Sequence, residues 1–426
     1  MHIDLEEDKL NLEKKLNKFE KFYDYIIIGS GPAASVILNN LLKTKKKILV
    51  VERGGFKKKK SGNLISSNFK IKKDSRVFGV GGTSNSWAQI YSLFSKNEMC
   101  NNKNVNIWPL SYKNLIYWCK KVGPKYQFNI DRLDDEQIYK KNFYSREFVY
   151  LKNPLRFSKY FKKQNFDMLT NCKVQTLDET RGKSKIFFNI ENNVYTLNSK
   201  KIIICAGAIE SCCLILNSLK DKKLRNLRNK KFIGRYFMDH PKCYVGELKF
   251  PKKNLIQSLI LKYKKNYYTY RGLSLFKKNQ KTLNTYVRFE EKKSFFKIRN
   301  KILIRIFLEM EPNFKNKIFI KDNNVNINLS ISKKEIEISK KLLNQVKFFF
   351  SLKPKLEKLN FNSSDLNDAS HHMGGLCYPK NVNKNLRLLG LKNIFCCSSA
   401  VFPTSGSANP TLIICALAER LSKFLQ

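Results

Sequence analysis

The chain has 426 residues, of which 42% are hydrophobic and 12% aromatic; this composition supplies a sizeable core, and the length favours two joined domains. An intrinsically disordered chain is excluded. The formal net charge is +48, but the excess is mostly Lys spread along the whole chain, without an RNP, KH or helix-turn-helix signature, so we expect a solvated surface and no nucleic-acid partner.

The N-terminal segment from Met1 to Phe22 is charged and has spaced leucines, which predicts an exposed amphipathic helix. No signal peptide is visible, and the longest uncharged run near the start, Tyr25 to Leu42, contains two glycines, a proline and two asparagines, so it is a poor bilayer span. The eleven cysteines include no CxxC pair, which favours buried reduced thiols over disulfides or a metal site. We therefore expect a cytoplasmic protein without a transmembrane segment, for which peripheral contact with anionic lipid stays open.

A βαβ unit follows, with a strand from Tyr23 to Ile28, a helix from Pro32 to Leu42 and a strand from Ile48 to Val51. The turn between the first strand and the helix reads Gly29-Ser30-Gly31-Pro32-Ala33-Ala34, a GxGxxG pattern with Ala at the third place. The first glycine permits a tight turn, the second lets the backbone approach a pyrophosphate, and the small third residue lets helix and strand pack. Glu52, at the end of the second strand, is expected to accept hydrogen bonds from a ribose hydroxyl. The unit predicts a dinucleotide site without distinguishing NAD from FAD.

The later elements are expected within and on both sides of a middle region, roughly Tyr244 to Leu366, that lacks glycine-rich motifs. We interpret that region as a substrate-facing domain inserted into the nucleotide-binding one. The pattern predicts strands at Lys201 to Cys205, Ile318 to Ile320, Val325 to Ile331 and Asn393 to Cys397, and helices at Lys334 to Ser351 and Pro410 to Phe424.

Five further segments occur in a fixed order after the first fingerprint. They run from Arg76 to Trp87, Cys205 to Ser211, Ile233 to Pro241, His371 to Gly375 and Val401 to Thr411. Together with Gly29 to Ala34, these segments resemble the glucose-methanol-choline (GMC) oxidoreductase family. The match is specific because six motifs in one order are hard to obtain by chance.

The resemblance implies an α/β fold, α+β overall, with a Rossmann-type FAD-binding domain assembled from discontinuous segments and an inserted sheet-and-helix substrate-binding domain. The expected division is a charged helical extension at 1–22, FAD-binding parts at 23–110 and 166–243, a substrate or cap segment at 111–165, a substrate-binding domain at 244–368, and a C-terminal FAD-binding and catalytic segment at 369–426.

The cofactor implied by the resemblance is non-covalent FAD, and no metal is expected. No His lies between His2 and His240, so a covalent link through a His of the early glycine-rich loop is excluded. The residues expected to bind FAD are Gly29, Ser30, Gly31, Pro32, Ala33, Ala34, Glu52, Arg53, Gly81, Gly82, Thr83, Asn85, Ser86, Trp87, Val174, Ala206, Gly207, Ser398, Ala400, Asn409, Pro410 and Thr411.

The mechanism implied by the resemblance is hydride transfer from a substrate carbon to flavin N5 while a base takes the alcohol proton. His371 occupies the family's H-x-x-G position and Asn409 the partner position; His suits a base because its ordinary pKa is near neutrality. His372 is the alternative base if the motif is placed one residue off, and His240 is expected to be structural.

The sequence therefore predicts an FAD-dependent oxidoreductase acting on a CH–OH donor (an alcohol, polyol or sugar), with a dehydrogenase favoured over an oxidase. The donor, the electron acceptor and the oligomeric state do not follow from the sequence. Two alternatives are a flavin-fold protein with non-redox chemistry, such as a lyase or decarboxylase, and a basic protein that binds nucleic acid or membrane.

Overall fold

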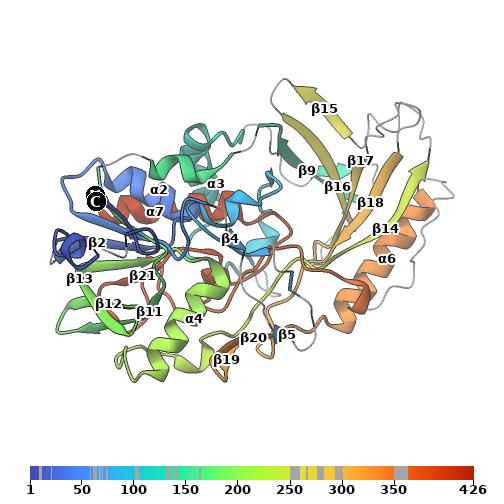
Figure 1. Cartoon of the computed structure of the whole chain (residues 1–426). Coiled ribbons are helices and arrows are strands. Elements are labelled where there is room, and N and C mark those ends of the chain that lie inside the picture. The colour runs from blue at the N-terminus through green and yellow to red at the C-terminus, as the bar shows by residue number, and fades with distance from the viewer. Residues whose placement is uncertain are drawn as a thin grey trace.

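The computed structural model consists of two large sheets that lie side by side, each with its own helices (Figure 1). Its description covers residues 1–8, 12–20, 22–57, 59–60, 65–66, 69, 71–72, 75–100, 105–130, 133, 137–139, 143–153, 155–162, 165–249, 260–264, 267–275, 283–292, 301–349 and 363–426. This arrangement is the mixed α/β fold that the sequence predicts: a largely parallel sheet built from distant segments and an antiparallel sheet beside it.

The first sheet contains the βαβ unit. Its strand order is β1–β10–β3–β2–β13–β12–β11, and β21 also pairs with β13. The pairs are parallel from β1 to β13 and at β21, and antiparallel from β13 through β12 to β11. The strands are β1 (His2–Asp4), β2 (Phe22–Ile28), β3 (Ile48–Val51), β10 (Asp167–Thr170), β11 (Val174–Thr180), β12 (Lys183–Ile190), β13 (Asn193–Ile204) and β21 (Ile394–Cys396).

Helices cover this sheet because its central strands are apolar on both faces. All four residues of β3 are buried, as is usual for parallel strands between helical layers. Helix α2 (Pro32–Leu41) packs against α7 (Thr411–Leu425), which also contacts α3 (Tyr112–Val122). Helix α4 (Gly207–Lys220) packs beside β11 and lies on the other side of the strands in Figure 1. Helices α2, α4 and α7 are the α-helices that follow strands β2, β13 and β21 along the chain, and each begins after the carboxyl end of its strand.

The second sheet is antiparallel, with the order β14–β18–β17–β16–β9–β7. Helix α6 (Lys333–Phe349) packs on β17 and covers its outer face. The strands are β7 (Ile90–Tyr91), β9 (Phe143–Leu151), β14 (Lys242–Lys249), β16 (Tyr267–Leu275), β17 (Tyr286–Lys292) and β18 (Lys301–Phe307), with β8 (Gln137–Tyr139) on β9 and β15 (Ile260–Lys264) on β16. Strands from three distant parts of the chain thus form one surface.

Short strands connect the two halves. The predicted strands at Ile318 to Ile320 and Val325 to Ile331 form the hairpin β19 (Lys317–Lys321) and β20 (Asn324–Asn328), which pairs with β5 (Ile65–Ser66). The strands β4 (Lys59–Lys60) and β6 (Val77–Phe78) form a separate pair. Because β19 packs against α4, this hairpin joins the first sheet's helical layer.

The N-terminal extension differs from the prediction of one exposed helix over residues 1–22, which is wrong. His2–Asp4 forms β1, which pairs in parallel with β10, and the helix in the described part of this segment, α1, spans Leu12–Leu16. Ile3 is fully buried, and Asp4 accepts hydrogen bonds from Thr170 and Asn171. The edge of the sheet supplies backbone partners that a sequence pattern of spaced leucines does not reveal.

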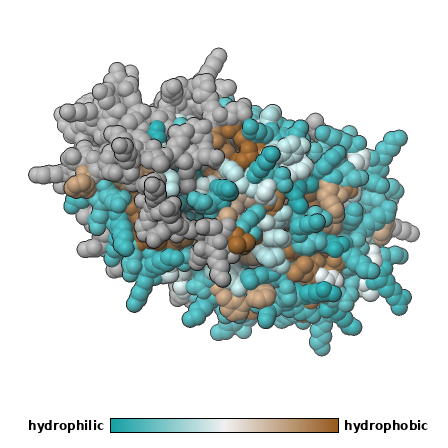
Figure 2. Space-filling view, turned by 180° about the vertical axis from the view of Figure 1, so that it is seen from behind, coloured by the Kyte–Doolittle hydropathy of each residue, from teal (hydrophilic) through white to brown (hydrophobic). Residues whose placement is uncertain are grey.

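The surface and the cysteines agree with the composition. Hydrophilic side chains dominate the face drawn in Figure 2, with apolar residues in scattered patches. All eleven cysteines are buried and unpaired, as expected. Among the helices in the described part of the chain, none has the length and apolar character needed to cross a bilayer.

Candidate active site

A cavity of about 620 Å³ runs between the two sheets. One end is lined by the first βαβ unit and the start of α4, and the other by β14, β17 and β18 together with the segment 369–372 and Asn409. The cavity therefore joins the predicted dinucleotide loop to the predicted catalytic residues.

The dinucleotide end is formed by two glycine-rich turns in contact. Gly29 has φ +97°, and a Cβ there would lie 2.7 Å from the carbonyl oxygen of Cys205, so no larger residue fits the turn. A Cβ on Gly82 would lie 3.1 Å from the Cα of Gly31, whereas one on Gly31 would meet open space. Helix α2 starts at this opening without a side-chain cap. Its first N–H groups are therefore available to an anion in the cavity.

Glu52 ties these turns together. One carboxylate oxygen accepts from the Ser30 N–H at 2.9 Å and its hydroxyl at 2.6 Å, and the other from the N–H groups of Gly54 at 3.1 Å and Gly79 at 3.3 Å. Burial raises the pKa of Glu52, and these hydrogen bonds act in the opposite direction. All four strong acceptor positions of the carboxylate are in use. Its contact with a ribose hydroxyl stays a prediction.

A cationic cluster follows at the α4 side of the cavity. Glu210, in the first turn of α4, pairs with Arg53 at 3.1 Å and with Arg76. The guanidinium of Arg53 lies 3.8 Å from the centre of the Phe78 ring, an orientation typical of cation–π contact. Arg53 and Arg76 share the single carboxylate of Glu210. The three side chains therefore carry a net positive charge, which suits the binding of a phosphate group at this wall of the cavity.

At the opposite end, three side chains form a chain of hydrogen bonds. His240 Nε2 lies 2.7 Å from the carbonyl oxygen of Gly406, His240 Nδ1 lies 2.9 Å from His371 Nδ1, and His371 Nε2 lies 2.7 Å from Asn409 Nδ2. The antiparallel bridge between Met238 and Met373 places the two His-bearing segments side by side. Sequence spacing could not have revealed this contact, because 131 residues separate the two His residues.

The carbonyl of Gly406 fixes the protonation of this chain. It can only accept, so His240 Nε2 carries a proton; a neutral His240 then accepts at Nδ1 from His371 Nδ1–H. The lone pair of His371 Nε2 is left facing the Asn409 amide, which donates to it. Burial lowers the pKa of His240 to about 4, and burial together with His240, Lys242 and Arg288 holds the pKa of His371 well below its ordinary value. His371 is thus a neutral imidazole with a defined basic nitrogen on the cavity.

Solved structures of low sequence identity share this fold. Pyridoxine 4-oxidase from Mesorbium loti is 13% identical, with a TM-score of 0.63 over 94% of this chain and 99% of that one. A mutant formate oxidase from Aspergillus oryzae RIB40 is 12% identical, with a TM-score of 0.67 over 95% of this chain and 98% of that one. No curated protein matches in sequence.

The C-terminal region provides the family. A family model described as GMC oxidoreductase matches residues 310–418, the part that carries both His371 and Asn409. Residues 310–418 are thus those of a GMC oxidoreductase, and the rest of the chain has a fold that agrees with this match. The chain is accordingly an FAD-dependent oxidoreductase, since FAD is the typical cofactor of the family.

FAD fits the cavity of this GMC oxidoreductase on three observations. The opening above Gly31 gives a phosphate access to the start of α2. The buried atoms Trp87 Nε1 and Asn409 Oδ1 have no protein partner although both residues line the cavity, so a bound molecule can satisfy them. The cations Arg53 and Arg76 complement the charge of a pyrophosphate.

Most of the residues predicted to bind FAD line the cavity, and four lie behind its wall. Those behind the wall are Ala34, Gly81, Asn85 and Ala400; Asn85, for example, donates to the carbonyl of Val80 at 3.0 Å. The lining residues are Gly29, Ser30, Gly31, Pro32, Ala33, Glu52, Arg53, Gly82, Thr83, Ser86, Trp87, Val174, Ala206, Gly207, Ser398, Asn409, Pro410 and Thr411. Sequence motifs missed the lining cations Lys173, Lys242 and Arg288.

The two adjacent His residues lie in different surroundings. His372 lies 3.3 Å from Asp368; burial opposes its protonation, but this carboxylate raises the pKa of His372 above its ordinary value. Asp239 accepts from the N–H groups of Ala369 and His371, each at 2.8 Å, and burial together with Asp368 raises its pKa to about 7. The carboxylates thus hold the segment that presents His371, and an ion-paired His372 is the poorer base of the two.

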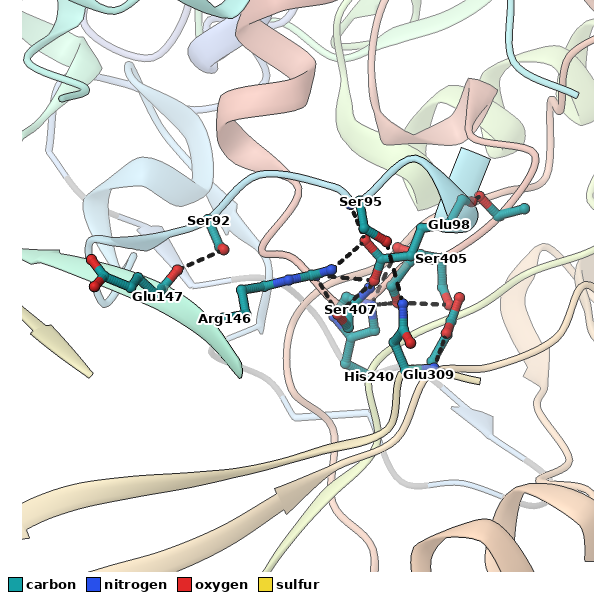
Figure 3. A network of polar contacts seen from close by, with 12 residues as sticks. Ser92, Ser95, Glu98, Arg146, Glu147, His240, Glu309, Ser405 and Ser407 are labelled. Carbon is teal, nitrogen blue, oxygen red and sulfur yellow. Dashed lines mark hydrogen bonds and ion pairs between the residues drawn. The ribbon is translucent and has the colours of Figure 1, made fainter. Parts of the chain in front are cut away.

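A buried ion pair supports the loop that carries Asn409. Figure 3 shows Arg146 reaching the carboxylate of Glu98, which also meets Ser407. Arg146 donates to Glu98 at 2.8 and 3.0 Å, and the backbone N–H and hydroxyl of Ser407 donate to it at 2.7 and 2.6 Å. Only 2% of Glu98 is exposed. By binding Ser407, the pair fixes this loop. The preceding residue in the loop, Gly406, accepts the hydrogen bond of His240.

Proposed function

We propose that this GMC oxidoreductase oxidises a CH–OH donor, with His371 as the base that takes the hydroxyl proton. The observation that carries the proposal is the unprotonated His371 Nε2 on the cavity, whose lone pair accepts from Asn409 and whose protonation state is fixed by the chain through His240 to the carbonyl of Gly406. A neutral base with a defined unprotonated nitrogen suits removal of an alcohol proton.

In this proposal, each side chain has a separate task. The donor hydroxyl would replace the Asn409 amide as the partner of His371 Nε2, which receives its proton, and Asn409 Nδ2 would then donate to the hydroxyl oxygen and orient it. His240 keeps the proton of His371 on Nδ1, so that Nε2 stays available, and Asp239 holds the backbone of His371. The loops around Gly31 and Gly82, with Arg53 and Arg76, would bind FAD, which supplies the acceptor for the hydride.

The donor and the acceptor are the finer points of the proposal. Pyridoxine 4-oxidase and formate oxidase, by their names, act on an alcohol and on formate, so the fold serves more than one kind of donor. We favour an alcohol because the His371–Asn409 pair provides both an acceptor and a donor for one hydroxyl. For the electron acceptor, we retain the expectation from the sequence, which favours a dehydrogenase over an oxidase.

Anaerobic flavin bleaching tests this function. The purified holoenzyme, mixed with a panel of polyols, sugars, hydroxy acids and small alcohols, should lose its oxidised flavin absorbance with at least one donor. Formate belongs in the panel as the competing donor class. Product formation without flavin reduction would instead support the lyase or decarboxylase alternative.

Release of the cofactor is a second test. We expect acid precipitation of the protein to release all of its FAD, because no His is available in the early glycine-rich loop for a covalent link. In addition, burial raises the pKa of the lining thiols Cys172, Cys205 and Cys213, which disfavours their reactive thiolate form. The supernatant absorbance measures the released flavin. Yellow colour that stays with the precipitate would contradict non-covalent binding.

The pH dependence of flavin reduction follows from the pKa of His371. A base acts above its pKa, and burial lowers the pKa of His371 well below the ordinary 6.5. Measured by anaerobic stopped flow from about pH 5 to about pH 9, the limiting rate should stay constant as pH falls through 6.5 and decline only at lower pH. An acid limb at or above 6.5 would mean that the base is not held neutral in the way described.

A further inference from the structure

Two cations line the cavity at the end where His371 lies: Lys242 on β14 and Arg288 on β17. Burial lowers the pKa of His371, and the charges of Lys242 and Arg288 lower it further. Neither residue belongs to a motif of the GMC fingerprint, so their role is not a property of the nucleotide loops.

Strand register explains why these two side chains share one face. Lys242, Phe307 and Tyr286 lie in one row across β14, β18 and β17. Alternate residues of a strand point to the same face, so Arg288, two residues after Tyr286, joins them. Phe307 lies between the cations: the Arg288 guanidinium is 4.5 Å from the centre of its ring and the Lys242 ammonium 5.7 Å.

The charges on this face do not balance. Arg146 is neutralised by Glu98, while Arg288 and Arg305 share the single carboxylate of Glu290. Lys242 Nζ has no ion pair or hydrogen bond in the described structure. The charge of Asp239 favours the ammonium form of Lys242, but no ion pair joins the two in the described structure, and the oxygens of Asp239 already accept from two N–H groups.

A half-buried ammonium without a counter-ion is costly, and proteins ordinarily pair such a charge. Burial, Lys72 and Arg288 lower the pKa of Lys242, which is the response of an ammonium that lacks a partner. An anion between Lys242 and Arg288 would remove this cost, and its position would set a hydroxyl of the same molecule against His371.

We infer that the donor is an anionic alcohol, whose carboxylate or phosphate is held by Lys242 and Arg288 while its hydroxyl meets His371 and Asn409. This inference rests on the proposed function and names its substrate class. Lys242 contributes a compact point charge and Arg288 a planar fork, a combination suited to a carboxylate or phosphate oxygen. Hydroxy acids, sugar acids and sugar phosphates have this chemistry, whereas neutral polyols lack the charged group.

Matched donors test the inference on the holoenzyme. We would measure anaerobic flavin reduction with gluconate against sorbitol, glucuronate against glucose, glycerate against glycerol, and glycerol 3-phosphate against glycerol. At least one charged donor should exceed its neutral counterpart by roughly 10-fold or more in second-order rate constant, and the advantage should shrink as ionic strength rises. The glycerate and glycerol 3-phosphate arms distinguish a carboxylate from a phosphate.

A substitution then assigns the effect to the cationic pair. Lys242→Met should lower the ratio of the second-order rate constants for the charged and the neutral donor by roughly 10- to 100-fold. Binding of propionate, an anion that offers no hydroxyl, should weaken similarly when followed by the perturbation of the flavin spectrum. Lys113→Met, the same change at an exposed position of α3, is the matched control and should alter neither result.

The possible failures are distinguishable. If no donor of either kind reduces the flavin, the proposed function is wrong. If neutral donors reduce it as well as their charged partners, or Lys242→Met slows both equally, the function stands and the anionic substrate class is overturned. Arg288→Lys, which keeps the charge but loses the fork, provides a second variant should Lys242→Met bind less FAD.

Discussion

Replacing His371 with Ala should lower the rate of flavin reduction by about 10²–10⁴-fold while FAD stays bound. The imidazole is the only described side chain that presents an unprotonated nitrogen to both Asn409 and the cavity. It lies at the end of the cavity away from the glycine-rich turns, so its loss should not open the cofactor site. Anaerobic stopped flow gives the rate, and the flavin-to-protein absorbance ratio gives the occupancy.

Two neighbouring variants define the role of His371. Asn409→Ala should lose less, because the base remains and only the orientation of the hydroxyl suffers. His372→Gln should have a small effect on the rate and a larger one on stability, since His372 compensates the buried carboxylate of Asp368. If His372→Gln stops flavin reduction and His371→Ala does not, His372 is the base; if neither change slows it, proton transfer to this pair is wrong.

The first βαβ unit could be predicted almost to the residue because its signals are local. The strand Ile48 to Val51 forms as predicted, and the helix after Gly31 begins at Pro32. Turn glycines, a first-turn Pro and an uninterrupted apolar run each act over a few residues, so the chain itself encodes them. The position of His371 beside Asn409 follows from family motifs, 38 residues apart, and the structure brings the two within hydrogen-bond distance.

The features that the sequence concealed all depend on distant pairing. His240 was expected to be structural, yet its contact with His371 arises only when the start of β14 aligns with the segment 367–373. Lys242 and Arg288 could not be singled out from the sequence of a chain so rich in Lys. Their position on a common face depends on the register across β14, β18 and β17. The burial of β1 likewise depends on an edge that β10, more than 160 residues away, provides.

Replacing Glu98 with Ala should lower the free energy of unfolding by about 3–5 kcal/mol, the largest effect on stability that we expect. The change takes a buried carboxylate away from Arg146, which is 7% exposed, and it removes the acceptor for both donors of Ser407. Burial opposes ionisation of Glu98, but Arg146 lowers its pKa, so the pair is charged in the folded protein. Chemical denaturation followed by fluorescence measures the loss.

The effect of Glu98→Ala should also reach the reaction. Ser407 anchors the loop on which Gly406 holds His240 and Asn409 faces His371, so the surviving folded enzyme should reduce its flavin more slowly. Glu20→Ala, which breaks the exposed pair with Lys47 at 2.9 Å, is the control and should cost no more than about 1 kcal/mol. Replacing Glu98 and Arg146 together with Leu and Met should recover much of the stability, because no charge is left unpaired. A double variant that regains stability but not the rate would separate the two roles of this pair: the fold needs the charges balanced, whereas the site needs Ser407 held in place.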